Sequence, residues 1–485
     1  MDLSRRTLIS GGAALSATAI LSPERLWAAE AADWALAVSD VEADIAPRAL
    51  RLVHGRAPAG LTGTLYRNGP AKFRYGAGEA AHWFDGDGLV RAFRIGDGQA
   101  RLAARFVDTP KRRADQAANA LVTPGFGTTG SARARVGGPD DLNAANTALL
   151  AVGGQLWALW EGGSPAAVDP ETLATKGFVT LRDDAKGMPF LAHPRVEPDG
   201  RVWNLGMNGR QAVIWRLSAS GALEDMKVIQ LPRSSYVHDF TATDRELVII
   251  LQPWVREKLV TPLAAGMAWK PELGTQVVVI DKADLTKRRT YELPALFFFH
   301  LGDAWRESDG TIRFDGCVSD DGAFVTKHVA SMTAAKPFEG SAPKNSMFVL
   351  HPNGRAEIMK GSRTAEFPRT DPRFAGLDRR YTWHVTGERS DRPLSDGVGV
   401  TDWRTGRTQS HSFGTRQLSE EAVFVPRPGS SAEGDGWLVG TSLNLKAKAT
   451  ELHVFDARRV ADGPLCTWRS DVALPVGFHG VFVSA

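Results

Sequence analysis

The stretch Pro198-Asp-Gly-Arg-Val-Trp-Asn-Leu-Gly-Met-Asn-Gly209 contains the pattern that decides the fold, an apolar run between two turn dipeptides. The run Arg201–Leu205 has the length and the side chains of a β-strand. Asp-Gly and Asn-Gly suit the positive φ angles of tight hairpin turns. The pattern recurs along the chain, with Asp-Gly at positions 85, 87, 97, 199, 309, 315, 321, 396, 435 and 462, and Asn-Gly at 68, 208 and 353. We therefore expect many short antiparallel strands.

Such strands are typical of a sandwich, a barrel or a propeller. A length of 485 residues would hold about three average domains, but no Ser- or Pro-rich linker and no charge block divides residues 32–485. Blades of about 40–50 residues allow seven in one unit. The prediction is an all-β fold, a single seven-bladed β-propeller over residues 32–485, capped by loops and short helices. Helical patterning is confined to residues 115–120 and 282–288.

Charge and cysteine content exclude several classes of function. The 58 basic and 55 acidic residues leave a net charge of +3, and no long basic run is present, so nucleic acid is a poor partner. Two cysteines, Cys317 and Cys466, cannot form a disulfide framework or a four-thiolate zinc site. Eleven histidines are present. A bound metal would therefore take nitrogen and oxygen ligands.

The N-terminus has the pattern of an export signal. Ser4-Arg-Arg-Thr-Leu-Ile9 precedes a small-residue apolar stretch over 10–21 and an Ala-rich segment over 28–32. Adjacent arginines before a short apolar run are typical of twin-arginine signals. The run is shorter than the roughly 20 residues of a membrane span. We predict that residues 1–31 direct the chain to the periplasm through the twin-arginine translocase; a frayed amphipathic helix is the alternative.

Four histidines lie among apolar or aromatic residues, where an unpaired imidazole would be costly. Each alone is explained most simply as a core histidine with a partner. Their separations of 45, 62 and 179 residues exclude a local metal loop. The inner strands of several blades could still bring them to the propeller axis, where an all-imidazole site would suit iron, zinc, copper or nickel. These residues are His193, His238, His300 and His479.

Three glutamates also lie in apolar surroundings. Glu161 follows Leu156-Trp-Ala-Leu-Trp160, Glu366 precedes Phe-Pro-Arg, and Glu421 precedes Ala-Val-Phe-Val-Pro. Metal-bound histidines usually donate their second N–H to a carboxylate or carbonyl, so these glutamates are candidates for orienting the imidazoles. The alternative, surface or arginine-paired glutamates, is equally compatible with the spacing.

Taken in order, these segments resemble the carotenoid cleavage oxygenases, a family that also contains stilbene-cleaving dioxygenases and retinal isomerohydrolases. The resemblance covers nearly the whole chain after the signal. Trp83 and Ala422 depart from it, standing where Phe and Pro are common. The resemblance rests on eight motifs, which are Gly60-Leu-Thr-Gly-Thr-Leu-Tyr-Arg-Asn-Gly-Pro70, His82-Trp-Phe-Asp-Gly-Asp-Gly-Leu-Val90, Leu191-Ala-His-Pro194, Val237-His-Asp-Phe240, Phe299-His-Leu301, Glu366-Phe-Pro-Arg369, Glu421-Ala-Val-Phe-Val-Pro-Arg427 and Gly477-Phe-His-Gly480.

The resemblance implies one Fe(II) per chain on the axis of a seven-bladed propeller. The four histidines would hold the iron, and Glu161, Glu366 and Glu421 would orient three of them. The implied reaction is O₂-dependent cleavage of a C=C bond in a carotenoid or apocarotenoid to two carbonyl products, with no catalytic residue beyond the metal site. Stilbene cleavage is the alternative, with Tyr75 and Lys111 holding a phenol. A further alternative is a non-catalytic carrier of apolar ligands with a structural metal.

The expected substrate is apolar and conjugated, so its tunnel is expected to be apolar and aromatic. Phe299 and Phe478, and also Trp254, Phe297 and Phe298, are candidates because they lie near the histidines in sequence. Packing between blades is the alternative role for each. Such substrates partition into lipid, so we expect the tunnel mouth to contact a membrane surface peripherally, although the sequence shows no amphipathic anchor.

Overall fold

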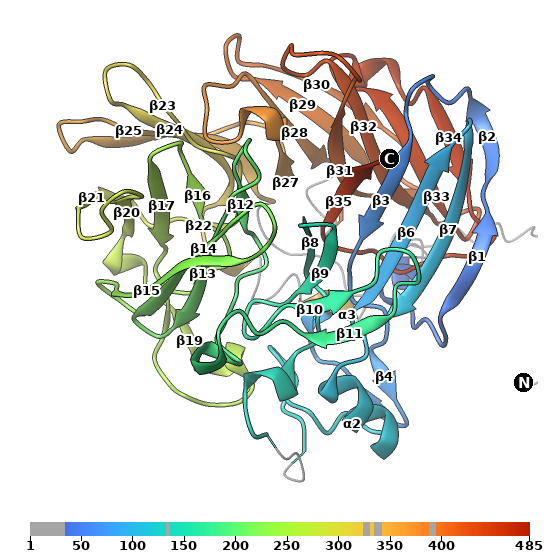
Figure 1. Cartoon of the computed structure of the whole chain (residues 1–485), viewed down its shortest axis with the longest axis horizontal. Helices are drawn as coiled ribbons and strands as arrows, with labels where there is room; N and C mark the ends of the chain where they lie inside the picture. Colours follow the sequence, from blue (N-terminus) through green and yellow to red (C-terminus); the bar gives the residue numbers. More distant parts are fainter. Residues whose placement is uncertain (1–33, 132–135, 324–329, 334–341, 388–393) are drawn as a thin grey trace, which may run out of the picture.

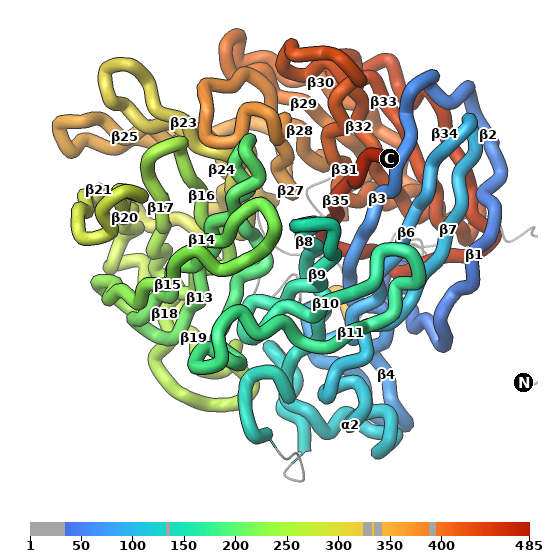
Figure 2. Tube along the Cα trace, in the orientation of Figure 1, coloured from blue at the N-terminus to red at the C-terminus, as the bar shows by residue number. Residues whose placement is uncertain are grey.

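The computed structural model describes residues 34–131, 136–323, 330–333, 342–387 and 394–485. In this part of the chain, seven antiparallel sheets surround a central axis (Figures 1 and 2). The predicted seven-bladed β-propeller is confirmed. The predicted export signal over 1–31 lies outside the described residues and stays a prediction. None of the helices in these ranges is long and apolar enough to cross a membrane.

Five blades follow the chain in order, and the first strand of each lies nearest the axis (Figure 1). The first blade is β8–β11 (Ala148–Val152, Gln155–Leu159, Ala166–Val168, Thr175–Phe178), and the second is β12–β15 (Arg195–Val196, Val202–Asn208, Gln211–Leu217, Leu223–Gln230). The third is β16, β17, β20 and β21 (Thr241–Ala242, Glu246–Leu251, Thr275–Asp281, Arg288–Leu293), and the fourth is β22 and β24–β26 (Phe297–Leu301, Ile312–Ser319, Lys344–Leu350, Ala356–Met359), with β23 (Trp305–Arg306) beside β24. The fifth is β27–β30 (Glu366–Arg369, Tyr381–Thr386, Gly397–Asp402, Arg407–Ser412).

The remaining two blades close the ring by joining both ends of the described chain. One contains β31–β34 and takes β2 as its outer strand. The other contains β1, β7, β6 and β3 and takes β35 as its inner strand. These strands are β1 (Ile45–Ala49), β2 (Arg51–Gly55), β3 (Gly63–Arg67), β6 (Leu89–Gly96), β7 (Gln99–Phe106), β31 (Gln417–Pro426), β32 (Gly436–Asn444), β33 (Ala449–Asp456), β34 (Cys466–Arg469) and β35 (Gly480–Ser484).

The hydrophobic core lies between neighbouring blades. Leu205 and Ile214 of one blade, for example, pack in a common cluster with Leu247 and Ile249 of the next. Central strands are consequently buried on both faces, and all six residues of β17 are buried. This explains why the sequence has apolar runs rather than strict alternation. At the β6–β7 hairpin, Asp97 and Gly98 adopt φ angles of 50° and 75°, as the Asp-Gly pattern predicts.

The helical expectations are met only in part. Helix α2 (Pro110–Ala118) overlaps the expected segment 115–120, and the Thr109 side chain accepts a hydrogen bond from the Arg112 N–H at its start. The helix expected over 282–288 is wrong, because this segment is the turn between β20 and β21. The Asp281 carboxylate accepts hydrogen bonds from the N–H groups of Ala283 and Asp284, which stabilises a turn instead of a helix.

Several small elements lie along the lower side of the ring in Figure 1. They are α2, the pair β4 (Arg74–Tyr75) and β5 (Gly78–Glu79), and the hairpin β18 (Trp254–Arg256) and β19 (Met267–Trp269), which interrupts the third blade between β17 and β20. Helix α3 (Ala330–Thr333) is a single turn. Of these elements, the β18–β19 hairpin also borders the cavity described next, through Arg256 and Met267.

Candidate metal centre

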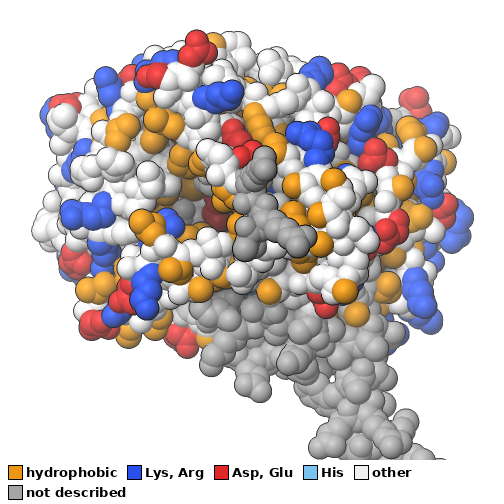
Figure 3. All heavy atoms as spheres, turned by 90° about the horizontal axis from the view of Figure 1, so that it is seen from below, with side chains coloured by type: hydrophobic (Ala, Val, Ile, Leu, Met, Phe, Trp, Pro, Cys, Tyr) orange, Lys and Arg blue, Asp and Glu red, His pale blue; other side chains and the backbone are white. Residues whose placement is uncertain are grey.

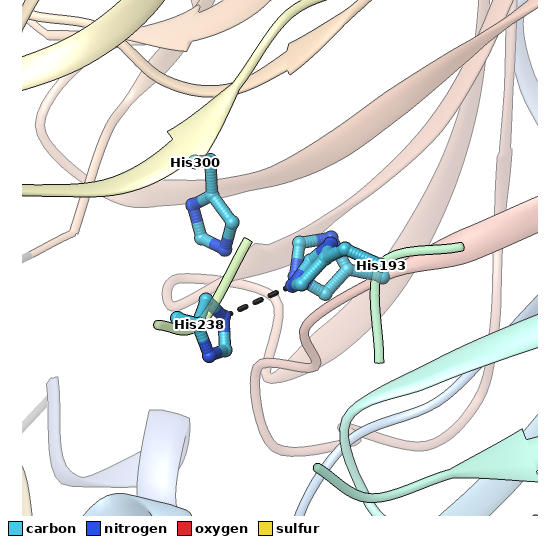
Figure 4. A group of neighbouring side chains, drawn as sticks. His193, His238 and His300 are labelled. Carbon is cyan, nitrogen blue, oxygen red and sulfur yellow. Dashed lines mark hydrogen bonds between the residues drawn. The ribbon is translucent and has the colours of Figure 1, made fainter. Parts of the chain in front are cut away.

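The four histidines meet at the axis of the ring. His193 lies just before β12, His238 just before β16, and His479 just before β35, while His300 lies within β22. One ligand atom of each lies within 4.8 Å of those of the other three. Figure 4 shows the labelled rings of His193, His238 and His300 turned toward a common point. The innermost strands of four blades therefore deliver side chains that are far apart in sequence.

Three of the imidazoles are oriented by the three glutamates singled out above. The distances from histidine Nδ1 to carboxylate oxygen are 2.8 Å for His238–Glu161, 2.5 Å for His300–Glu366 and 2.8 Å for His479–Glu421. Each carboxylate comes from a blade other than that of its histidine. A carboxylate accepts a hydrogen bond here, so Nδ1 carries the proton and Nε2 keeps its lone pair. Three lone pairs are thereby aimed at one point.

The inward nitrogens fit a metal ion. His300 Nε2 is buried and has no hydrogen-bond partner among the described residues. His193 Nε2 lies 2.9 Å from His238 Nε2 (dashed in Figure 4). Two imidazoles at right angles on one ion would have this spacing, because bonds of about 2.1 Å separate their nitrogens by roughly 3 Å. A shared cation accounts for both observations.

Burial keeps two of these imidazoles neutral, which is the form that binds metals. Burial, reinforced by the neighbouring histidines, holds the pKa of His193 well below its usual range. Burial also lowers the pKa of His479 to about 3, although Glu421 opposes the shift. Neither His193 nor His479 therefore has to lose a proton at neutral pH before it can bind a metal ion.

The three carboxylates have different partners of their own. Glu421 accepts two hydrogen bonds from Arg369, at 2.8 and 2.9 Å, and one from the Gly480 N–H at 2.8 Å. Burial disfavours its charge, but Arg369 and His479 outweigh burial and lower its pKa well below the usual range. Glu161 accepts a hydrogen bond from the Tyr236 hydroxyl at 2.5 Å. Sequence reasoning missed Arg369 and Tyr236, although both lie within three residues of a residue it had singled out.

A cavity of about 570 Å³ opens beside the histidines, and His238, His300 and His479 form part of its wall. Phe299 and Phe478 line it, where they were expected. Other aromatic residues of the lining were not anticipated, namely Trp83, Phe84, Phe126, Trp160, Tyr236 and Phe367. Trp254, Phe297 and Phe298 are not lining residues. Trp254 and Phe297 pack behind Phe299, and Phe298 packs between blades.

Tyr75 and Lys111 do not contact this cavity. The Tyr75 hydroxyl donates to Asp87 Oδ2 at 2.5 Å, and Lys111 Nζ lies 2.8 Å from Asp87 Oδ1 and 3.1 Å from Asp115 Oδ2. All four side chains are buried. The two residues are neighbours, as a shared phenol would require, but their polar atoms serve a buried ion cluster that holds α2 against the turn at residue 87. This placement argues against the expected phenol contact.

Lys111→Ala is therefore expected to destabilise the protein instead of changing its specificity. Removing the ammonium leaves two buried carboxylates uncompensated, at a cost of about 3–5 kcal/mol. Chemical denaturation should show this loss, with activity toward polyenes and stilbenes falling together. Lys176→Ala is the control, because Lys176 forms an exposed ion pair with Asp169 whose loss costs about 1 kcal/mol or less. A selective loss of stilbene activity at unchanged stability would contradict this interpretation.

Known proteins match this chain over nearly all of its length. The family model described as "Retinal pigment epithelial membrane protein" matches residues 39–484. The apocarotenoid-15,15′-oxygenase of Synechocystis is 29% identical over 464 residues, which cover 88% of this chain and 91% of the relative. The lignostilbene-alpha,beta-dioxygenase isozyme III of Sphingomonas paucimobilis is 27% identical, with coverage of 89% and 93%.

A solved structure of a similar protein has the same fold. The cobalt-substituted apocarotenoid oxygenase of Synechocystis superposes with a TM-score of 0.83 at 26% identity, covering 94% of this chain and 99% of that one. The described histidine cluster lies at the axis of the ring. The chain belongs to the carotenoid cleavage oxygenase family and is an oxygenase by that membership.

Proposed function

We propose that the protein is an Fe(II)-dependent dioxygenase that cleaves one C=C bond of an apocarotenoid or carotenoid to two carbonyl products. The observation that carries the proposal is the convergence of four imidazoles, three of them oriented by carboxylates, beside an aromatic cavity. Similarity to an apocarotenoid oxygenase supports the choice of substrate class.

The protein's own residues have two tasks in this reaction. When bound, ferrous iron supplies the activation of O₂. The glutamates fix the imidazole rings, and their negative charges raise the basicity of the ligands. Phe299, Phe478 and Phe84 line the cavity as a wall against which a flat conjugated chain can lie. Cleavage needs no separate acid or base, so positioning of the correct double bond is the main contribution of the cavity.

Product analysis tests this proposal against its alternatives. Iron-loaded protein would be incubated separately with an apocarotenal and a hydroxystilbene, and the products identified by mass spectrometry. We expect aldehydes from the polyene. Products from the stilbene alone would favour the alternative that the similarity to a lignostilbene dioxygenase supports. Tight binding of both compounds without any product would favour the non-catalytic carrier.

Peripheral membrane contact is part of the proposal. Leu259 is 84% exposed, and the neighbouring Val260 and the more distant Val136, which both line the cavity, are 42% and 47% exposed. Figure 3 shows hydrophobic side chains around a hollow near the centre of the face seen there. An apolar rim of this kind suits delivery of a substrate that is dissolved in lipid.

Leu259→Lys is expected to weaken binding to phosphatidylcholine vesicles by about tenfold, because burial of a leucine side chain contributes roughly 1.5–3 kcal/mol. Vesicle flotation measures the effect. Leu377→Lys is the matched control, since Leu377 is 42% exposed and does not line the cavity. Equal flotation of both variants and the unmodified protein would rule out contact through this rim.

A further inference from the structure

Arg256 is the single arginine or lysine among the described residues that line the cavity. It ends β18, the first strand of the hairpin that extends from the third blade. Its Nε is buried without a hydrogen-bond partner. None of the described side chains forms an ion pair or a hydrogen bond with its guanidinium group. A partly desolvated cation without a partner is costly, so a ligand is the natural source of the missing acceptor.

The backbone that carries Arg256 is held in place by neighbouring segments. Arg256 pairs with Met267 across the β18–β19 hairpin, and its N–H donates to the Ser234 carbonyl at 3.2 Å. One residue earlier, Val255 forms a bridge to Ser235, and Trp254 packs against Tyr236 with ring centroids 4.7 Å apart. The strand is thus anchored to the segment that carries His238.

The other charged groups of the cavity wall already have partners. Glu161 is bound by His238 and Tyr236, and Glu366 by His300. Glu420 accepts hydrogen bonds from the Thr441 hydroxyl and the Gly477 N–H, and lies 3.4 Å from Arg91. No carboxylate of the wall therefore neutralises Arg256. Ser234 is a polar residue of the lining that lies beside Arg256, since its carbonyl accepts the Arg256 N–H.

We propose that Arg256 binds a carboxylate at one end of the conjugated substrate, so that conjugated acids bind more tightly than neutral polyenes or stilbenes. A guanidinium presents two parallel N–H donors that match a carboxylate. The same cavity contacts the histidines, so an acid held at Arg256 extends its conjugated chain toward them. The proposal rests on the proposed function for the identity of the conjugated chain, and the carboxylate binding itself is independent of cleavage.

Binding to the iron-loaded protein without oxygen tests this directly. The probes are all-trans-retinoic acid and its methyl ester, and stilbene-4-carboxylic acid and its methyl ester, with Kd from quenching of tryptophan fluorescence. We expect at least one acid to bind about 10- to 100-fold more tightly than its ester, as for a charge-assisted hydrogen bond. Arg256→Gln should abolish that ratio, and Arg256→Lys should restore part of it. Arg245→Gln is the control, because Arg245 is paired with Asp244 on the surface.

An acid-to-ester ratio that is the same in Arg256→Gln and the unmodified protein overturns the proposal, provided that iron content and Tm are unchanged. A ratio confined to the polyene pair or to the stilbene pair supports it and identifies the scaffold. Oxygen is absent, so the outcome does not depend on turnover. Acid selectivity at Arg256 without cleavage in air would contradict the proposed function alone, whereas cleavage without acid selectivity would contradict this inference alone.

Discussion

His238→Ala is expected to abolish iron binding and, with it, all oxygenase activity. His238 Nε2 is 2.9 Å from His193 Nε2, and its Nδ1 is bound to Glu161. The substitution removes one ligand and also the imidazole that Glu161 binds. The negative charge of Glu161 then stays in the site without the imidazole and without the metal. Iron content after anaerobic reconstitution with Fe(II) measures the effect. The same loss is expected for His193, His300 and His479.

The matched control for this prediction is His351→Ala. His351 also forms a histidine–glutamate pair, 2.8 Å from Glu357, but it lies away from the axis at a partly exposed position. This variant should bind iron normally. Full iron occupancy in any of the four alanine variants would show that the assignment of ligands is wrong.

Glu366→Gln is expected to weaken iron binding by about 10- to 100-fold without abolishing it. The glutamine keeps the size of the side chain and an oxygen that can accept the His300 Nδ1–H, but it removes the negative charge. Glu366 also accepts a hydrogen bond from the Phe367 N–H at 2.9 Å, which the amide oxygen can retain. The fold should therefore survive, and the change should appear in competition with a metal chelator.

Glu357→Gln is the control for Glu366→Gln, because it changes the same residue type beside a histidine on the surface. Its iron affinity should equal that of the unmodified protein. If Glu366→Gln also retains full iron affinity, the charge of Glu366 does not contribute to iron binding, and the role of this residue is structural.

The sequence contained enough information to predict the fold and the four histidines that cluster at its axis. Asp-Gly pairs such as Asp97-Gly98 adopt positive φ angles that few other residues accept, so hairpins could be predicted from short stretches of sequence. His300 and Glu366 were each conspicuous because a polar group in an apolar run requires a partner. Their actual pairing across two blades, at 2.5 Å, needs the propeller to be known.

The environment of a side chain could not be predicted where it depends on packing between distant segments. Lys111 was expected in the substrate site, but two buried aspartates neutralise it in an ion cluster. The role of Arg256 could not be predicted, because a single arginine in a loop-like stretch has no distinguishing pattern. Its lack of a partner becomes visible only when the cavity is assembled from several blades and loops.

The most direct test of the central claim is the fate of O₂ in the iron-loaded protein. The protein would be incubated with a polyene carboxylic acid under ¹⁸O₂, with oxygen uptake, metal content and product mass measured together. The account predicts iron in the protein, oxygen uptake in proportion to products, and two carbonyl products of which at least one carries the label. A protein that binds zinc in place of iron, takes up no oxygen and leaves the polyene intact would contradict the account.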